Sequence, residues 1–212
     1  MTTPTQFFEA LDQLPLVAIV RGIQPEEAVE VGRIFHKTGF RIMEVPLNSP
    51  RPFESIANLT QAFGDDLIIG AGTVRTIDDV KAVAKAGGKL IVMPHFDEPV
   101  VRAAVEMGLL TTPGVCTPSE AFGALNAGAT GLKAFPGELV TPPVLKAMRA
   151  VLPKETRILS VGGINPDNLG EYWAAGANGF GLGSALYKPG MTLETIEENA
   201  RRFVANMKAI TG

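Results

Sequence analysis

The chain has 212 residues, 46% of them hydrophobic, and a formal net charge of -3. This length favours one domain spanning residues 1–212, and the apolar fraction is ample for a large core. Acidic and basic residues are scattered without a basic block, so neither nucleic acid nor an anionic membrane surface is an expected partner. The single cysteine, Cys116, excludes an internal disulfide and a cysteine-based metal cluster.

Targeting signals are not apparent in the sequence. The N-terminal stretch MTTPTQFFEA lacks the basic segment and long apolar run of a secretion signal. No apolar run approaches the roughly 18 residues that would suggest a membrane span. We therefore expect a cytoplasmic protein without a membrane partner.

The first predicted element is a helix, TQFFEALDQL, which has Phe7, Phe8, Leu11 and Leu14 to bury. We expect this extra N-terminal helix to cover the bottom of the fold. Eight short apolar runs follow at a spacing of roughly 25 residues, which is about the size of one βα unit. They are LVAIV from Leu16, IMEVPL from Ile42, LIIGAGTV from Leu67, LIVMP from Leu90, LLTTPGV from Leu109, GLKAFP from Gly131, RILSVGGI from Arg157 and GFGLGSALY from Gly179.

Helical patterns follow the apolar runs and carry the expected start and stop residues. Thr76 and Thr117 stand where N-caps belong, and glycines follow the last turns. The segment NPDNLGEYWAAG repeats the scheme from Asn165 and Pro166, and the last helix runs from about Thr192 to Ile210. Eight βα units in about 200 residues predict an α/β fold, a (β/α)8 TIM barrel with the extra N-terminal helix. A doubly wound open sheet is the alternative, although it usually has fewer strands.

Three ionisable residues lie late in apolar strands: Arg21 after LVAIV, Glu44 in IMEVPL and Lys133 in GLKAFP. In a barrel, alternate strand residues point inward and catalytic groups gather at the C-terminal strand ends. If Lys133 points inward, Glu44 can do the same, and Thr73 at the end of the third strand adds a hydroxyl. Each has a purely structural alternative, in which Lys133 snorkels or pairs with Glu44 and Arg21 contacts a helix terminus or a phosphate. Their convergence predicts one shared site.

Glycines gather at the ends of the seventh and eighth strands, in SVGGIN and GFGLGS. Glycine lets backbone N–H groups approach an anion closely, and in barrels the loops after these strands are the usual phosphate site. Either run alone would also suit a tight turn. Together they predict that Gly162, Gly163, Gly183 and Ser184 form a phosphate cradle.

The chemistry of these groups indicates a lyase. A buried lysine loses proton affinity, and its neutral amine forms a Schiff base with a ketone. Glu44 is the expected proton shuttle, and Arg21 with Thr73 the expected carboxylate site. The prediction is an imine-forming lyase that acts on a phosphorylated keto acid without a cofactor. His36 and His95 lack a ligand spacing, so no metal is expected, and a substrate contact by His95 stays open.

Two other functional classes stay open at this point. A phosphosugar isomerase also uses a barrel, a glutamate and a phosphate cradle, but it does not require a covalent lysine. A non-catalytic phosphosugar sensor would keep the glycines and gain nothing from Lys133.

Over nearly its whole length the sequence resembles the KDPG/KDPGal aldolase family, which cleaves 2-keto-3-deoxy-6-phospho sugar acids. The motifs that carry the resemblance are AIVRGI, EVPLNSP, GAGTV, LIVMP, PGVCTPSEA, LKAFP, VGGI and GLGSALY. The resemblance implies that Lys133 forms the pyruvate imine, that Glu44 moves protons, and that Arg21 and Thr73 bind the pyruvate carboxylate. It also implies a homotrimer. We expect further pyruvate contacts from Pro94 and Phe135.

Two positions resemble the galactonate branch of that family. The gluconate branch has EVTLRT where this chain has EVPLNSP, so Asn48 replaces an arginine and carboxylate binding shifts to Arg21. Val161 replaces a threonine, which makes it the expected determinant of C4 configuration. The implied reaction is cleavage of 2-dehydro-3-deoxy-6-phosphogalactonate to pyruvate and glyceraldehyde 3-phosphate. An aldolase for the gluconate epimer, or for both, is the alternative. His95 in place of asparagine, and the stretch FPGELVTPP, depart from the family pattern.

Overall fold

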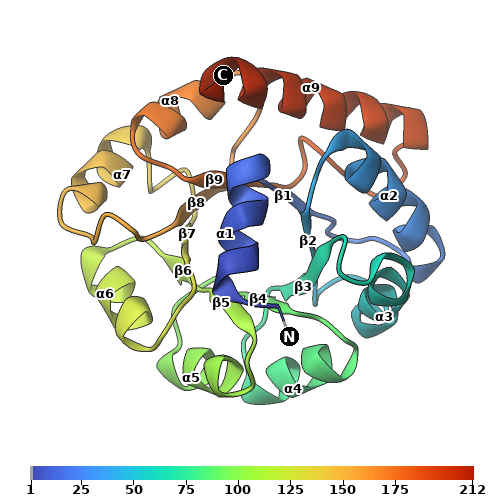
Figure 1. Cartoon of the computed structure of the whole chain (residues 1–212), viewed down its shortest axis with the longest axis horizontal. Helices are drawn as coiled ribbons and strands as arrows, with labels where there is room; N and C mark the ends of the chain where they lie inside the picture. Colours follow the sequence, from blue (N-terminus) through green and yellow to red (C-terminus); the bar gives the residue numbers. More distant parts are fainter. Residues whose placement is uncertain (1) are drawn as a thin grey trace.

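The computed structural model describes residues 2–212, and its strands curl into a barrel ringed by helices (Figure 1). All strand pairs are parallel, in the order β5-β4-β3-β2-β1-β9-β8-β7-β6. The strands are β1 (Leu16–Ile19), β2 (Ile42–Pro46), β3 (Ile68–Gly72), β4 (Leu90–Val92), β5 (Leu110–Thr112), β6 (Gly114–Val115), β7 (Leu132–Ala134), β8 (Ile158–Val161) and β9 (Gly179–Leu182). The helices are α1 (Pro4–Gln13), α2 (Pro25–Thr38), α3 (Pro52–Phe63), α4 (Ile77–Lys85), α5 (Glu98–Glu106), α6 (Pro118–Asn126), α7 (Pro142–Arg149), α8 (Leu169–Ala174) and α9 (Leu193–Thr211).

The fifth predicted strand is divided at Pro113 into β5 and β6. Proline has no N–H to donate to a ladder, so regular pairing is interrupted there. β5 pairs with β4 through Leu110 and Leu90, whereas β6 pairs with β7 through Gly114 and Lys133. One stretch of chain therefore serves both neighbours and closes the ring. The predicted (β/α)8 barrel is confirmed, with this one strand in two pieces.

Helix α1 lies across the N-terminal end of the barrel, as predicted (Figure 1, centre). Its N-terminus is a capping box in which the Thr3 hydroxyl accepts from the Gln6 N–H and the Gln6 side chain accepts from the Thr3 N–H. Phe7 and Leu11 pack into the inner end of the barrel, and both are almost fully buried. Burying a side chain of this size contributes about 1.5–3 kcal/mol. The helix therefore closes the floor of the barrel.

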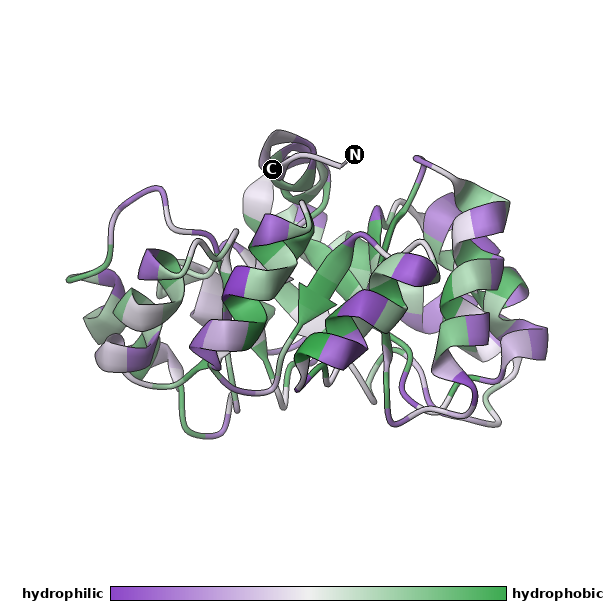
Figure 2. Ribbon diagram, turned by 90° about the horizontal axis from the view of Figure 1, so that it is seen from below, coloured by the Kyte–Doolittle hydropathy of each residue, from purple (hydrophilic) through white to green (hydrophobic). Residues whose placement is uncertain are grey.

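Alternation along the strands separates an apolar layer against the helices from one inside the barrel, and it also decides which polar side chains point inward. Met43 and Val45 pack outward against the helices, while Ile42 on the same strand packs inside the barrel. Glu44 shares the inward face of Ile42 because successive side chains point to opposite sides. Figure 2 shows apolar strands at the centre and polar residues on the outer helix faces. The predicted parity of the second strand is confirmed.

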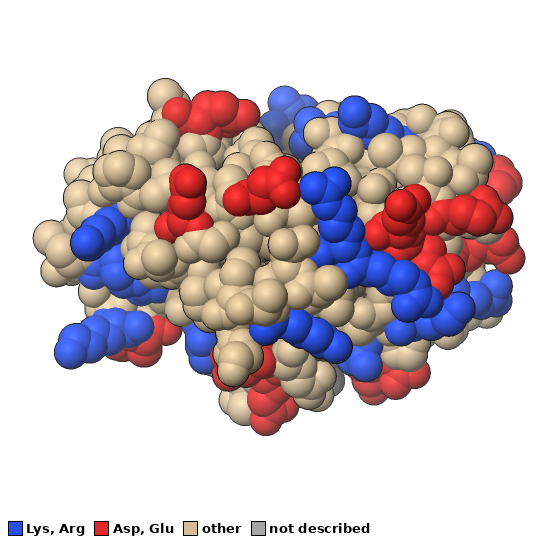
Figure 3. Space-filling model, turned by 90° about the horizontal axis from the view of Figure 1, so that it is seen from above, with Lys and Arg blue, Asp and Glu red and all other residues tan. Residues whose placement is uncertain are grey.

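The helices begin and end close to their predicted positions, with one exception. Thr76 and Thr117 are N-caps, and their hydroxyls accept from backbone N–H groups three residues on. Helix α8 begins only at Leu169, because Asn165 Oδ1 accepts from the N–H groups of Asp167 and Asn168 in a turn. None of the helices within residues 2–212 is long and apolar enough to cross a membrane. Acidic and basic side chains lie interspersed on the face drawn in Figure 3, so any attraction for an anion has to arise locally.

Candidate active site

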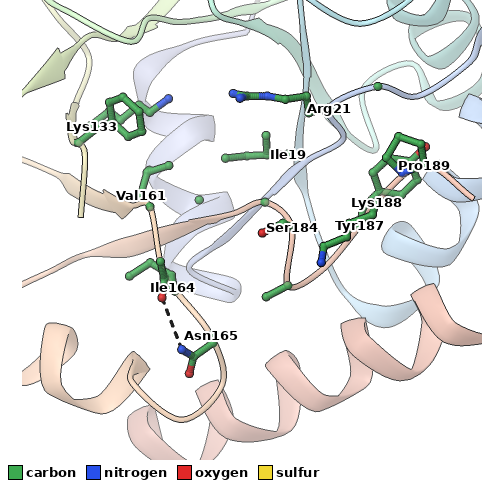
Figure 4. A pocket seen from close by; sticks show the side chains of 17 residues that line it. Ile19, Arg21, Lys133, Val161, Ile164, Asn165, Ser184, Tyr187, Lys188 and Pro189 are labelled. Atoms are coloured by element: carbon green, nitrogen blue, oxygen red, sulfur yellow. Dashed lines mark hydrogen bonds between the residues drawn. The ribbon is translucent and has the colours of Figure 1, made fainter. Parts of the chain in front are cut away.

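A cavity of about 710 Å³ opens at the C-terminal ends of β1, β7, β8 and β9 (Figure 4). Its volume lies in the range of small-molecule sites. Predicted site residues from all four strands line it: Arg21, Lys133, Phe135, Val161, Gly162, Gly163, Gly183 and Ser184. Of the four residues predicted to converge on one site, Arg21 and Lys133 line this cavity, whereas Glu44 and Thr73 do not.

Lys133 lies in β7 with only 6% of its surface exposed. Its Nζ is 4.6 Å from the centre of the Phe135 ring. Burial lowers the pKa of Lys133, the nearby Arg21 charge lowers it further, and Glu44 opposes both. Within residues 2–212, no carboxylate is close enough to form a salt bridge with Lys133. The amine is thus held in an apolar setting that favours its neutral form, and in Figure 4 it points across the cavity toward Arg21.

Glu44 lies in β2 with 2% of its surface exposed, and its Oε2 has no hydrogen-bond partner within the described chain. Burial raises the pKa of Glu44 to about 7, although the charges of Lys133 and Arg21 act in the opposite direction. A carboxyl group with this pKa exchanges protons readily near neutral pH. Glu44 and Lys133 both line a second, small cavity inside the barrel, so the two side chains share one interior.

Gly72, which was not predicted as a site residue, makes room for the Glu44 carboxyl group. A Cβ added to Gly72 would lie 1.9 Å from Glu44 Oε2 and 2.4 Å from its Cδ. Such distances are far below van der Waals contact, so any larger residue at position 72 would force the Glu44 carboxyl group to move. The available signal was the pair of glycines in GAGT at the end of a strand, since glycine inside a strand often marks a close approach.

Thr73 and Pro94 stand at strand ends but do not line the large cavity. Thr73 follows Gly72 and has φ 58°, a left-handed conformation that is strained for a β-branched residue. The backbone carbonyl of Pro94 packs against Gly114, where an added Cβ would lie 2.5 Å away. His95 is exposed and lines neither of the two cavities. The pyruvate contacts expected of Thr73 and Pro94 stay predictions.

The glycine loops leave backbone donors free at the far end of the cavity. Gly162 and Gly163 have φ 106° and φ 65°, which glycine adopts at little cost. The backbone N–H groups of Gly163, Ser184 and Ala185 donate to no protein acceptor within residues 2–212. Successive free N–H groups in a turn form an anion-binding concavity. The predicted cradle therefore has the donors that a phosphate requires.

Residues after the second glycine loop also line the cavity, although they were not predicted from the sequence. Tyr187 is buried there and its hydroxyl donates to Glu27 Oε1 at 2.8 Å, which fixes the loop to α2. Lys188 is exposed and adds a positive charge beside Ser184 (Figure 4). The sequence signal was a lysine four residues beyond the serine of GLGSALYKPG. Backbone dipoles are thus not the only source of positive potential at this end.

A hydrogen bond between loops supports the position of Arg21. The Gly22 N–H donates to Ser49 Oγ at 2.9 Å, and Ser49 is almost fully buried. The bond joins the loop after β1 to the loop after β2. It fixes the backbone next to Arg21, so the guanidinium approaches the cavity from a supported base.

A buried lysine in the wall of the large cavity, a buried carboxyl group in the small cavity beside it and free backbone donors, all within a (β/α)8 barrel, fit the site of a Schiff-base aldolase. The sequence comparisons agree. The model of the family "KDPG and KHG aldolase" matches residues 8–200, and the chain belongs to this family. The resemblance that the motifs indicated is confirmed.

Similar proteins include one curated aldolase and two solved structures. The 2-dehydro-3-deoxy-6-phosphogalactonate aldolase of Escherichia coli strain K12 is 45% identical over 193 residues, covering 91% of this chain and 94% of the relative. A solved structure described as "Native KDPGal structure" superimposes with a TM-score of 0.92 at 43% identity, covering 93% and 96% of the two chains. A cube-shaped cage designed by fusing symmetric oligomeric domains matches with a TM-score of 0.91 at 43% identity, covering 93% of this chain and 73% of the cage chain.

Proposed function

We propose that the protein is a class I aldolase that cleaves 2-dehydro-3-deoxy-6-phosphogalactonate to pyruvate and glyceraldehyde 3-phosphate. The observation that carries the proposal is the Lys133 amine, buried in β7 and pointing into the large cavity. The substrate follows from the galactonate-branch relatives and from the anion cradle at the other end of that cavity. We place the reaction in the cytoplasm, where the sequence predicts the protein to reside.

The first step is attack of the neutral Lys133 amine on the C2 ketone of the substrate. Addition gives a carbinolamine, and loss of water from it gives the protonated imine. The apolar surroundings lower the pKa of Lys133, and the Arg21 charge lowers it further, so the amine loses its proton more readily for this step. Arg21 also faces the lysine across the cavity, where its guanidinium can hold the substrate carboxylate.

The second step breaks the C3–C4 bond. A base removes the proton from the C4 hydroxyl, the electron pair of the C3–C4 bond moves to the imine nitrogen, and glyceraldehyde 3-phosphate leaves. The enamine that remains takes a proton at C3, and hydrolysis of the imine releases pyruvate and restores Lys133. Glu44 supplies both proton transfers, directly or through a water, because its pKa of about 7 lets it act as base and as acid.

The cradle and Val161 recognise different parts of the substrate, namely the phosphate and the configuration at C4. The free N–H groups of Gly163 and Ser184, assisted by Lys188, bind the phosphate. Val161 lies between Lys133 and the cradle and lines both cavities. This position places its side chain beside the middle carbons of a bound substrate, where it can discriminate between C4 epimers.

Trapping of the imine tests the chemistry. The protein is incubated with pyruvate, reduced with borohydride and weighed by mass spectrometry. We expect one pyruvate-derived adduct that maps to Lys133 and is lost in Lys133→Ala, while Lys146→Ala, an exposed lysine on α7, retains it. An isomerase or a sensor would give no adduct, and that result would refute the imine mechanism.

Two kinetic measurements test the roles of Glu44 and the substrate branch. Glu44→Gln should still form some imine but lose proton exchange at the pyruvate methyl group, and full exchange would remove Glu44 from its role. The galactonate epimer should have the higher kcat/KM. Equal values for the two C4 epimers would contradict the branch assignment.

A homotrimer is the assembly we propose. The support is the match to a symmetric oligomeric design and a set of exposed apolar side chains on and near α6 and α7, namely Phe122, Leu139 and Val144. Sedimentation equilibrium should give three times the chain mass of 22.4 kDa. A monomeric mass would overturn this proposal without affecting the chemistry at Lys133.

A further inference from the structure

Thr112 carries a hydroxyl group on the inner wall of the barrel that the proposed mechanism does not use. It follows Leu110 on the inward face of β5 and is fully buried. Its Oγ1 has no hydrogen-bond partner within residues 2–212. The neighbouring Thr111 differs, because its backbone N–H donates to Thr130 and its hydroxyl accepts from the Thr130 N–H. A buried hydroxyl without a partner is unfavourable, so the inward-facing one calls for an explanation.

The small cavity inside the barrel supplies that explanation. Thr112, Glu44 and Lys133 are the polar side chains that line it, and the rest of its wall is apolar. Glu44 Oε2 is the other unpartnered buried oxygen in this lining. The cavity volume of about 10 Å³ is close to the lower limit for one water molecule, which needs two to four polar partners. Two unpartnered oxygens and an amine meet this requirement.

We propose that Thr112 is a positioning residue for proton transfer, and that its hydroxyl holds an internal water against the Glu44 carboxyl group. The proposal rests on the proposed function, since it concerns how Glu44 is prepared for its role. The water donates a hydrogen bond to Glu44 and directs the other carboxyl oxygen toward the substrate side. Thr112 itself does not touch the substrate.

The charge state of Glu44 depends on this water. The charged groups that act on Glu44 are Lys133 on β7 and Arg21 at the end of β1, and both favour the carboxylate. A hydrogen bond donated to the carboxylate acts in the same direction. Removing the hydroxyl of Thr112 should therefore raise the pKa of Glu44, and the acid limb of the pH profile for proton exchange should move to higher pH.

Thr112→Val tests the proposal because it keeps the shape of the side chain and removes the hydroxyl. We expect the rate of proton exchange at the pyruvate methyl group to fall about tenfold, which is a part of the roughly 100-fold or larger effect of a general base. The acid limb of the pH profile of this exchange should move to higher pH. Imine trapping with borohydride should be unchanged. Thr112→Ser should restore the wild-type rate and profile. Ser160→Ala is the matched control, since Ser160 is also a buried hydroxyl without a partner but lies on the helix-facing side of β8.

Several results would overturn the proposal. Wild-type exchange and pH profile in Thr112→Val would do so, as would failure of Thr112→Ser to restore them. If Thr112→Val does not fold, a high-resolution crystal structure of the wild-type protein decides, because a dry cavity between Thr112 and Glu44 contradicts the inference. Loss of borohydride trapping in the wild-type protein would instead refute the imine mechanism itself, so the two failures are distinguishable.

Discussion

Glu44→Gln should make the protein more stable at pH 8 than the wild type, while the two proteins should differ little at pH 4.5. Glutamine has the shape of a protonated glutamate and carries no charge. Burial raises the pKa of Glu44 from 4.5 to about 7, so the folded protein binds a proton that the unfolded chain has released across this range. Stability therefore falls as the pH rises from 4.5 to 7 and stays lowered above it.

The size of the effect follows from the same values. Each pKa unit corresponds to about 1.4 kcal/mol, so a change from 4.5 to about 7 amounts to roughly 3 kcal/mol at pH 8. Urea unfolding of both proteins at pH 4.5, 6 and 8 measures the difference in the free energy of unfolding. An effect this large is a sizeable fraction of the stability of a typical domain.

Lys133 requires a control because its contribution to stability changes with pH in the direction opposite to that of Glu44. Its pKa is lowered by burial, so the unfolded chain binds the extra proton and stability rises with pH through that window. Repeating the comparison in the Lys133→Met background removes this contribution. The dependence on Glu44 should then be at least as large, because the lysine charge that lowers the pKa of Glu44 is gone. A difference between the glutamate and glutamine proteins that does not change with pH would refute the reasoning.

Three further predictions concern residues around Glu44 and Arg21. Gly72→Ala must displace the Glu44 carboxyl group by about 1 Å, so pyruvate proton exchange should fall on the order of 100-fold while borohydride trapping persists; unchanged exchange would show that the carboxyl group moves without consequence. Thr73→Gly should relieve the left-handed backbone strain, so the melting temperature should be unchanged or higher. The same variant should raise KM for pyruvate in the exchange assay, and an unchanged KM would exclude Thr73 from the site. Ser49→Ala leaves the Gly22 N–H without its acceptor and should cost about 1 kcal/mol in urea unfolding, with weaker pyruvate binding; wild-type stability would show that solvent replaces the bond.

The sequence predicts the fold well because each βα unit repeats the same local signals. Apolar runs of the right length recur along the chain, and caps such as Thr76 and Thr117 with closing glycines agree with them in several units. Alternation along a strand is also a local property, and it suffices to aim Glu44 and Lys133 inward once the barrel is assumed. These features need no knowledge of distant contacts.

Other features depend on contacts between distant parts of the chain, and local patterns do not encode them. The close approach at Gly72 is to the side chain of Glu44, which lies 28 positions earlier on the neighbouring strand. Tyr187 lines the cavity because its loop is tied to Glu27 on α2. Pro113 is visible in the sequence as a possible interruption of the strand. The pairing of its two halves with different neighbours, however, follows from closure of the ring.

The helix across the barrel floor makes the acidity of the active site a property of the whole chain. Phe7 and Leu11 touch no predicted substrate group, yet they seal the apolar interior that lies beneath Glu44 and Lys133. Solvent admitted from below would weaken the desolvation that sets both pKa values. A change at the N-terminus, such as a fused tag that tilts α1, can thus be felt as altered catalysis at the opposite end. In this sense α1 contributes to the reaction without touching the substrate.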